Sequence, residues 1–249
     1  KDMDRMHFVW ELLSRQGGDA TNYPDSARPE LVNLMEAAPT RALELGCHKG
    51  AMGAAVKQRF PGLHYTGIEI NPDTANIARS RIDEVLVEDL LKLDTDAHAA
   101  FAQPFDAIML ADVLEHLYDP WATLVKLGRH LAPGGKVYAS IPNVRNLALI
   151  SELIKGNWTY QSAGLLDVTH IRFFTLRECR RMFAETGYVI EKIVSVRDPR
   201  VQLDGAFSAP VTIMDKAFSL HDVDAQTATE LATLQFLFVL GRPTPEVPA

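Results

Sequence analysis

An acidic residue and two glycines stand close together at the end of a short apolar run. Glu44, Gly46 and Gly50 belong to the stretch Arg41-Ala42-Leu43-Glu44-Leu45-Gly46-Cys47-His48-Lys49-Gly50. Glycine tolerates positive φ and leaves the backbone bare, so a ligand can lie against the main chain where a Cβ would prevent it. The pattern predicts a strand that turns sharply into a helix beside a ligand.

A second carboxylate, Glu69, ends the next apolar run, which covers residues 63–68. Doubly wound folds place at this point the carboxylate that binds the ribose hydroxyls of a nucleoside. A solvated acid at a strand end is the alternative for Glu44 and Glu69. Two such acids one helix apart, together with the glycines, favour a nucleoside site.

A third group of chemically active side chains is Asp112-x-x-Glu115-His116, directly after a predicted strand at residues 107–110. In a structural role, Glu115 and His116 hydrogen-bond the loop and shape the pocket. In a catalytic role, Asp112 and His116 act on the substrate, since a neutral imidazole can take a hydroxyl proton near pH 7. The sequence leaves both roles open.

Strands and helices must alternate to place these residues at one edge of a sheet. The strands are expected at 41–45, 64–69, 85–88, 107–110 and 136–141, and the helices at 29–37, 51–60, 72–80 and 120–131. This alternation predicts βαβ units, and hence an α/β fold with a mostly parallel sheet and helices on both faces. Ligands in such sheets bind at the carboxyl ends of the strands.

Residues 143–172 are too long for an ordinary loop, and we expect them to form a substrate lid inserted after the fifth strand. The segment contains a predicted helix at 146–155 and three candidates for substrate contact, Trp158, Tyr160 and His170. His170 is either a second base or a packed side chain, and the two aromatic rings either stack on the acceptor or anchor the lid. Asn143, at the end of the fifth strand, is a further candidate.

The remaining segments are expected to frame this core as one domain over residues 1–249. Residues 1–25, with a helix at 7–15, form an N-terminal cap. A capping-box spacing at Thr175 opens a helix that Gly187 ends. Strands follow at 188–196 and 234–240, and the segment 197–229 between them is expected to be irregular, either as a homodimer contact or as a pocket wall.

The motifs in this order resemble those of class I S-adenosylmethionine (SAM) dependent methyltransferases. The motifs that carry the resemblance are Glu44-x-Gly46-x-x-x-Gly50, Glu69, Val87-Glu88-Asp89, Phe105-Asp106-Ala107-Ile108-Met109-Leu110 and Leu131-Ala132-Pro133-Gly134-Gly135. The resemblance implies a Rossmann-like sheet of seven strands whose last strand is antiparallel. It covers roughly residues 40–195 at matching spacing.

Three further stretches resemble a subgroup that is often fused to, or encoded beside, glycosyltransferases. They are Ala111-Asp112-Val113-Leu114-Glu115-His116-Leu117, Ser140-Ile141-Pro142-Asn143-Val144 and the segment 164–175, with an upstream match in Tyr23 and Arg28-Pro29-Glu30-Leu31. This resemblance implies a sugar hydroxyl as the methyl acceptor. It does not identify a residue that contacts a sugar.

The family resemblance also implies the roles of the cofactor residues. Glu44, Gly46 and Gly50 would surround the methionine and ribose of SAM, and Glu69 would hold both ribose hydroxyls. The remaining roles concern adenine and closure of the site: Asp89, or its neighbour Glu88, accepts from the adenine amine, Ile70 and Leu90 flank the ring, and Tyr23 closes over the cofactor. His48 stands where the family often has glycine.

A magnesium site is a further interpretation of the acidic and histidine residues. Asp112, Glu115, His116 and His170 resemble the metal ligands of magnesium-assisted 2′-O-RNA and quinone-type methyltransferases. Imidazole is an unusual ligand for magnesium. We therefore predict no metal site.

Composition narrows the class of partner. The chain has 249 residues, of which 47% are hydrophobic, and a formal net charge of −7. An acidic protein is poorly suited to bind a phosphate backbone, so no nucleic acid partner is expected. The two cysteines provide no disulfide framework. The sequence also shows no apolar run long enough to span a membrane and no secretory leader. These observations together favour a cytoplasmic location.

The sequence therefore predicts a SAM-dependent enzyme that methylates a hydroxyl of a small polar acceptor, foremost a sugar in glycan or natural-product biosynthesis. A quinone-type or other aromatic O- or N-methyltransferase is the first alternative. A non-catalytic subunit that uses the same fold to bind a partner is the second.

Overall fold

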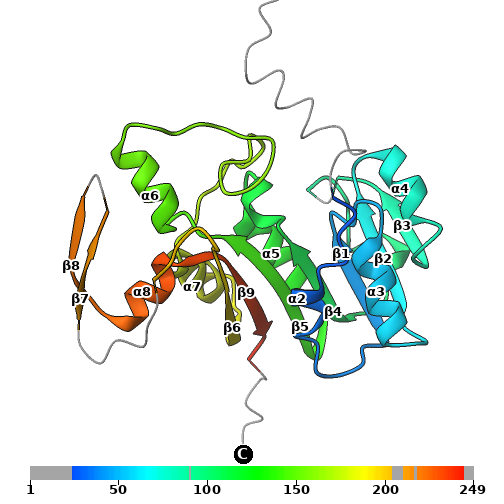
Figure 1. Cartoon of the computed structure of the whole chain (residues 1–249). Helices are drawn as coiled ribbons and strands as arrows, with labels where there is room; N and C mark the ends of the chain where they lie inside the picture. Colours follow the sequence, from blue (N-terminus) through cyan, green and yellow to red (C-terminus); the bar gives the residue numbers. More distant parts are fainter. Residues whose placement is uncertain (1–23, 90, 204–209, 216–217, 244–249) are drawn as a thin grey trace, which may run out of the picture.

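The computed structural model describes residues 24–89, 91–203, 210–215 and 218–243 (Figure 1). A seven-stranded sheet in the order β3-β2-β1-β4-β5-β9-β6 forms its centre. The strands are β1 (Arg41–Leu45), β2 (His64–Glu69), β3 (Glu84–Val87), β4 (Phe105–Ala111), β5 (Leu131–Pro142), β6 (Val189–Arg197) and β9 (Thr233–Gly241). Neighbours from β3 to β5 are parallel, and β9 is antiparallel to β5 and β6. The predicted fold class is confirmed.

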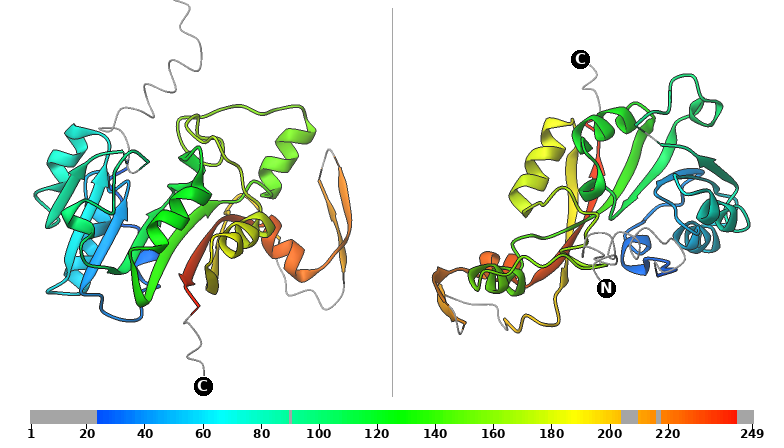
Figure 2. Two further views of the ribbon diagram at one scale, coloured as in Figure 1. Left: turned by 180° about the vertical axis from the view of Figure 1, so that it is seen from behind. Right: turned by 90° about the horizontal axis from the view of Figure 1, so that it is seen from above.

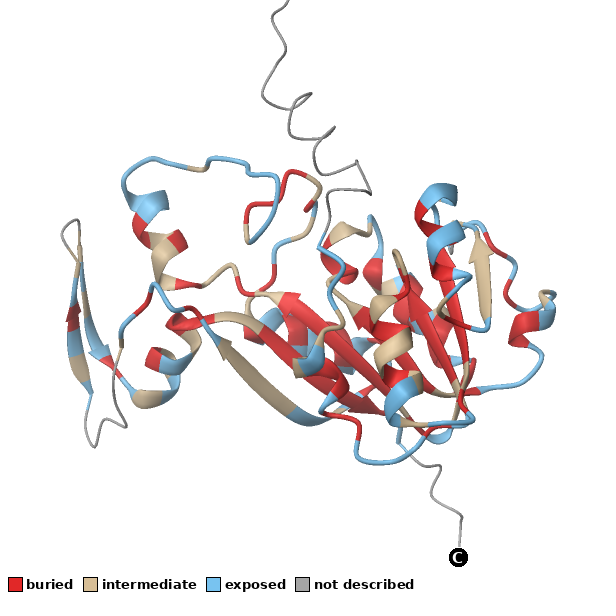
Figure 3. Ribbon diagram, turned by 45° about the vertical axis from the view of Figure 1, so that its right-hand side comes forward, coloured by how far each residue is buried: buried red, intermediate tan, exposed pale blue. Residues whose placement is uncertain are grey.

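Both faces of the sheet are buried, because successive strand residues point to opposite sides. In β1, Leu43 and Leu45 belong to one apolar core and Ala42 to the other. The first core is covered by α5 (Pro120–Gly128) and α7 (Leu176–Glu185), and the second by α2 (Pro29–Val32), α3 (Ala51–Arg59) and α4 (Pro72–Ala78). Figure 2 shows these helical layers from two further directions, and Figure 3 shows buried residues concentrated along the central strands.

Polar caps fix where several helices begin. Asn71 caps α4, Asp119 caps α5, Asn146 caps α6 (Leu147–Ile154) and Thr175 caps α7, each through a side-chain oxygen that accepts from a backbone N–H of the first turn. Gly187, just past α7, has φ 83° as expected for a glycine that ends a helix. These starts agree with the sequence pattern.

Two predicted helices, α2 and α5, end three or more residues earlier than expected. The helix expected over 29–37 stops at Val32, because Leu34 and Met35 leave the helix and are both buried against the sheet. The helix expected over 120–131 stops at Gly128, and Leu131 already pairs with Phe105 as the start of β5. In both cases tertiary packing outweighs local helical propensity.

The segment 197–229 was expected to be irregular, but its described residues include regular elements. It contains a hairpin of β7 (Val211–Met214) and β8 (Ser219–Val223), followed by α8 (Ala225–Leu231). Ile213, Val223, Ala228 and Leu231 form a third apolar cluster there, onto which Leu147 and Ile150 of α6 pack. Figures 1 and 2 show this unit at the opposite end of the molecule from β3 and α4.

Some predictions lie outside the described residues. They are the helix at 7–15, most of the cap at 1–25, Tyr23 and Leu90. Within the described ranges, no helix combines the length and the apolar composition needed to cross a membrane.

Candidate active site

A cavity of about 820 Å³ opens at the carboxyl ends of the central parallel strands. This volume lies within the usual range for a small-molecule site. One side is lined by the ends of β1, β2 and β3, and the other by residues after β4, by the lid and by β9. One cavity therefore adjoins both the predicted cofactor residues and the predicted catalytic residues.

The turn after β1 adopts the left-handed conformation three times within five residues. Gly46, His48 and Gly50 have φ of 70°, 49° and 77°. Gly46 lines the cavity, whereas Gly50 does not. A Cβ on Gly50 would lie 3.1 Å from the backbone of Ala78 in α4. The lack of a side chain at Gly50 serves the close packing of the turn on α4. Its contact with the cofactor stays a prediction.

Glu69 is held rigidly where the turn after β1 meets the end of β2. Its Oε2 accepts from the backbone N–H of His48 at 2.8 Å, and its Oε1 accepts from that of Asn71 at 2.9 Å. The side chain lines the cavity and is 8% exposed. Each carboxylate oxygen keeps a further lone pair, so two neighbouring hydroxyls can donate to it.

Glu44 forms a buried part of the cavity wall. The phenol of Tyr65 donates to its Oε2 at 3.0 Å. Burial raises the pKa of Glu44 to about 8, and the nearby negative charge of Glu69 acts in the same direction. A positively charged ligand at this wall would offset the cost of the ionised form.

The side chains after β2 and β3 form the outer end of the cavity. Asp89 is half-buried and accepts from the N–H of Leu91 at 3.0 Å, whereas its neighbour Glu88 is exposed. Both line the cavity, as do Ile70 and Leu91, which are 69% and 46% exposed. The place of Ile70 in the cavity lining is compatible with its predicted role beside the adenine, and Leu91 is an apolar cavity residue that was not predicted.

Arg28 connects the N-terminal side of the cavity to the end of β4. Its Nη1 donates to Asp112 Oδ2, its Nη2 donates to Ser140 Oγ at 3.1 Å, and its Nε donates to Glu30. Ser140 Oγ in turn donates to Asp112 Oδ1 at 2.6 Å. Arg28 lines the cavity. Sequence reasoning did not predict this place for Arg28, because the only signal was the family match around Arg28-Pro29-Glu30-Leu31.

Several residues with a strained backbone conformation line this cavity. Among the described residues, four that are not glycine have positive φ, namely Arg28, His48, Asp112 and Asp222. The first three line the cavity. Strain of this kind costs about 1–3 kcal/mol per residue and typically persists at functional sites.

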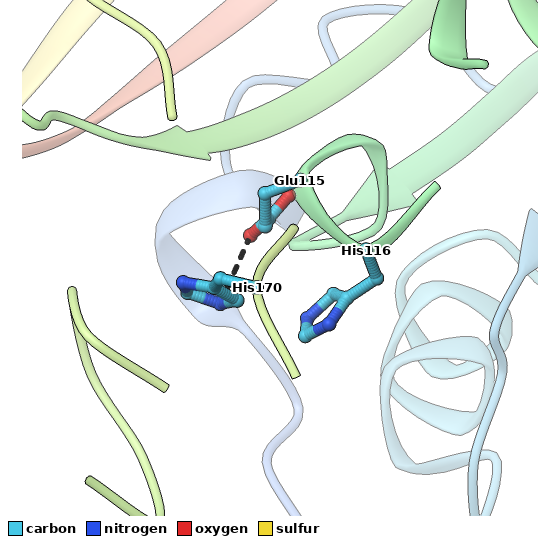
Figure 4. Close-up of side chains that lie close together, drawn as sticks. All are labelled: Glu115, His116 and His170. Carbon is cyan, nitrogen blue, oxygen red and sulfur yellow. Dashed lines mark ion pairs between the residues drawn. The ribbon is translucent and has the colours of Figure 1, made fainter. Parts of the chain in front are cut away.

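Glu115, His116 and His170 come together on the lid side of the cavity (Figure 4). Glu115 and His116 belong to the short 3-10 helix η3 (Leu114–His116), and His170 belongs to the lid. The two imidazole rings lie edge to face with centroids 4.7 Å apart, and His170 Nε2 is 3.9 Å from Glu115 Oε1. The structure thus places two residues together that are 54 positions apart in sequence.

Burial alters the acid–base properties of this group. Glu115 is 1% exposed, and burial together with the charge of Asp112 raises the pKa of its carboxyl well above the usual range. Burial and the neighbouring His116 lower the pKa of His170. A carboxyl and imidazoles in one water-poor group can hold or accept a proton, or can bind a metal ion.

The three residues predicted to contact the acceptor do not line the cavity. Asn143 is fully buried and donates to the carbonyls of Glu230 and Thr233 at 2.7 and 2.9 Å, so it anchors the start of the lid. Trp158 packs on Phe173, and Tyr160 is 43% exposed. All three thus lie outside the cavity lining, and their contacts with a substrate stay a prediction.

Other residues occupy the acceptor side in their place. The lid contributes Gly164, Leu165, Asp167 and Thr169, and β9 contributes Gln235. Gln235 pairs with Pro142 across β5 and β9. No local pattern in the sequence reveals that pairing, which explains why these residues were missed.

Comparison with known proteins gives the same picture. A family model described as a methyltransferase domain matches residues 20–193, more than half of the chain. The ubiquinone biosynthesis O-methyltransferase of Aeromonas salmonicida is 26% identical over 63% of this chain and 66% of its own length. The protein of the same name from Xylella fastidiosa is 32% identical over 47% of each. The matches thus span about half to two thirds of these relatives.

Solved structures share the fold over nearly the whole chain. A putative methyltransferase of Haloferax volcanii, in complex with the Trm112 methyltransferase activator, has a TM-score of 0.59 at 18% identity and covers 95% of this chain and 96% of that chain. The N-methyltransferase NodS of Bradyrhizobium japonicum, in complex with S-adenosylhomocysteine (SAH), has a TM-score of 0.56 at 17% identity, with 94% and 98% covered. At such identities the likeness concerns the fold.

The motif residues, the cavity at the strand ends and the family match agree. The non-catalytic alternative is therefore not retained, and SAM is the methyl donor. The chain belongs to the methyltransferase-domain family and is a class I SAM-dependent methyltransferase.

Proposed function

We propose that this enzyme transfers the methyl group of SAM to a hydroxyl oxygen of a small polar acceptor, foremost a sugar in glycan or natural-product biosynthesis. The observation that carries the proposal is the group of Glu115, His116 and His170 in the same cavity as Glu69. SAM lies along the β1–β3 side, with its ribose on Glu69 and its adenine near Asp89 and Ile70. The acceptor enters between β4, the lid and β9.

Methyl transfer to a hydroxyl requires that donor and acceptor are aligned and that the hydroxyl loses its proton. The sulfonium already carries a good leaving group, so the enzyme mainly has to hold donor and acceptor in line. This alignment lowers the activation barrier by on the order of 7 kcal/mol or more. The hydroxyl must also lose its proton as the new carbon–oxygen bond forms. His116 and His170 are the proposed groups that make this possible, either as proton acceptors or through a metal ion. Asp112 keeps its place in the site as a partner of Arg28.

The lining of the acceptor side supports a polar substrate. Asp167, Thr169 and Gln235 face this side together with the two histidines. The lid aromatics Trp158 and Tyr160, which would stack on an aromatic acceptor, lie elsewhere.

An aromatic acceptor of the quinone type is the second candidate. Two observations favour it: the relatives named above are ubiquinone biosynthesis O-methyltransferases, and Leu117, Leu165 and Leu234 give the same side apolar surface.

Methyl-labelled SAM tests the proposal. The purified protein is incubated with it and a fractionated cell extract, and the labelled products are separated and their methyl groups identified by NMR. An O-methyl group in nucleotide sugars or glycans supports a sugar as the acceptor. An O-methyl group in lipid-soluble aromatic compounds supports the second candidate. Label on nitrogen or carbon alone contradicts O-methyl transfer. His116→Ala is expected to abolish labelling with unchanged SAH affinity, whereas His64→Ala, on the surface, leaves both unchanged.

A further inference from the structure

The group of Glu115, His116 and His170 has the dimensions of a metal site. One ligand atom from each residue can be chosen so that all three lie within 4.8 Å of one another. Figure 4 shows the carboxylate and the rings converging from η3 and the lid. Two buried residues and one half-buried residue contribute, so part of the group faces the cavity.

Glu115 lacks the partners that a buried carboxylate needs. Neither Oε1 nor Oε2 has a hydrogen-bond partner among the described residues, although the side chain is 1% exposed. A buried polar atom without a partner costs about 1–3 kcal/mol, and more when it is charged. A cation between Glu115 and the histidines would remove this cost.

Both imidazole rings are held by carbonyl oxygens of the lid. His170 Nδ1 lies 3.2 Å from the carbonyl of Leu165, which leaves Nε2 toward Glu115. His116 Nδ1 lies 3.2 Å from the carbonyl of Thr169. Histidine ligands of metals typically donate their other N–H to a carbonyl or carboxylate, which fixes the ring and its tautomer.

Asp112 does not belong to this group. Its two carboxylate oxygens are taken by Arg28 and Ser140, and the guanidinium charge beside it opposes a second cation. The donor set is therefore one carboxylate and two imidazoles. Such a set suits manganese, iron, cobalt or zinc, whereas magnesium prefers oxygen ligands.

We propose that Glu115, His116 and His170 bind one divalent first-row transition-metal ion at the acceptor side of the cavity. Because His170 comes from the lid, the ion fastens the lid to η3. Its role toward the acceptor rests on the proposed function: a bound ion holds the hydroxyl oxygen and lowers the pKa of the hydroxyl. His116 is then a ligand and not the proton acceptor, and the proton of the hydroxyl passes to solvent water through the open cavity.

Titration with cobalt(II) tests the proposal without SAM or acceptor. The full chain, free of any affinity tag and treated with a chelator, is titrated with CoCl₂ and followed by visible absorption and calorimetry. The expected result is one ion per chain, displaced by zinc and not by magnesium at the same concentration. Absence of binding, or equal competition by magnesium, would overturn the proposal.

Variants locate the ion. Glu115→Gln and His170→Gln are expected to weaken cobalt binding at least tenfold, while folding is checked by circular dichroism. His64→Gln is the matched control, because His64 also lies beside a carboxylate, 3.6 Å from Glu84, without a third ligand. Unchanged binding in a folded Glu115→Gln or His170→Gln would contradict the site.

If these variants do not fold, the cobalt titration of the unmodified protein alone tests whether the metal site exists. SAH affinity, measured on the same samples, separates the two proposals. Cobalt binding without SAH binding would contradict the proposed placement of SAM and leave the metal site intact.

Discussion

The two carboxylates proposed to bind the cofactor have different environments. Glu69 is fixed by two backbone N–H groups and is ready to accept from hydroxyls. Glu44 is buried with a single phenol donor, which makes its charge costly in the empty protein. The two acids are therefore expected to differ in what substitution does to binding and to stability.

Glu69→Ala is expected to lower the affinity for SAH at least tenfold. Each hydrogen bond to a charged group contributes about 1.5–3 kcal/mol, and the ribose would lose two of them. Isothermal titration calorimetry measures the change, with Glu84→Ala as the matched control at the start of the neighbouring strand β3. Equal affinities of the Glu69 variant and the unmodified protein would remove Glu69 from the ribose site.

Glu44 makes stability depend on pH. Its pKa in the folded protein is about 8, above its ordinary value of 4.5, so the folded state holds a proton that the unfolded state has lost. The free energy of unfolding should therefore fall as pH rises from about 4.5 to about 8, by up to about 1.4 kcal/mol per pH unit, relative to Glu44→Gln. Urea unfolding at pH 6, 7 and 8 measures this difference. Parallel pH profiles of the two proteins would contradict it.

Sequence reasoning at the residue scale predicted correctly which of these residues stand at the ends of strands. The acids and glycines at the strand ends were found because each follows an apolar run at a spacing that the fold demands. Gln235, Leu91 and Arg28 were missed, since their place in the cavity depends on strand pairing and long-range ion pairs. Asn143 was predicted to contact the substrate because it follows Pro142 at the end of the fifth strand. In the structure Pro142 lines the cavity and Asn143 does not.

At the scale of elements, the sharp turn between β1 and α3 positions the cofactor side. Gly46 N and Cys47 N both donate to the carbonyl of Ile68 at 2.8 and 3.1 Å, which ties the turn to the end of β2. Gly50 then starts α3 in direct contact with α4. The turn therefore depends on close backbone packing as well as on positive φ.

Gly50→Ala tests this packing. The substitution combines a φ of 77° with a Cβ only 3.1 Å from the backbone of Ala78, so a loss of about 2–3 kcal/mol in the free energy of unfolding is expected. Gly156→Ala is the matched control, because Gly156 has φ 86° and open space around its Cβ position. The control should lose only about 1 kcal/mol. Equal losses in urea unfolding would show that contact with α4 contributes nothing.

Element boundaries were less predictable than element types. Alternating apolar runs and polar caps identified the strands and the helix starts. The end of α2 depends on the burial of Leu34 and Met35, and the end of α5 depends on the pairing of Leu131 with Phe105. The regular elements among the described residues of 197–229 depend on the third apolar cluster. Those contacts join segments far apart in the chain, so no local window contains them.

At the scale of the whole molecule, the sheet order brings the residues proposed to bind the cofactor and the acceptor into one cavity. The switch in strand order between β1 and β4 places Glu44 and Asp112 at adjacent strand ends. The lid then adds His170, and β9 adds Gln235 on the far side. Donor and acceptor can therefore meet in line without a second domain.

A crystal structure of the protein with SAH tests this arrangement most directly. The account predicts the ribose hydroxyls on Glu69, the adenine beside Asp89 and Ile70, and the sulfur turned toward His116 and the lid. SAH bound in this cavity with its sulfur turned away from His116, or bound outside the cavity, would contradict the account.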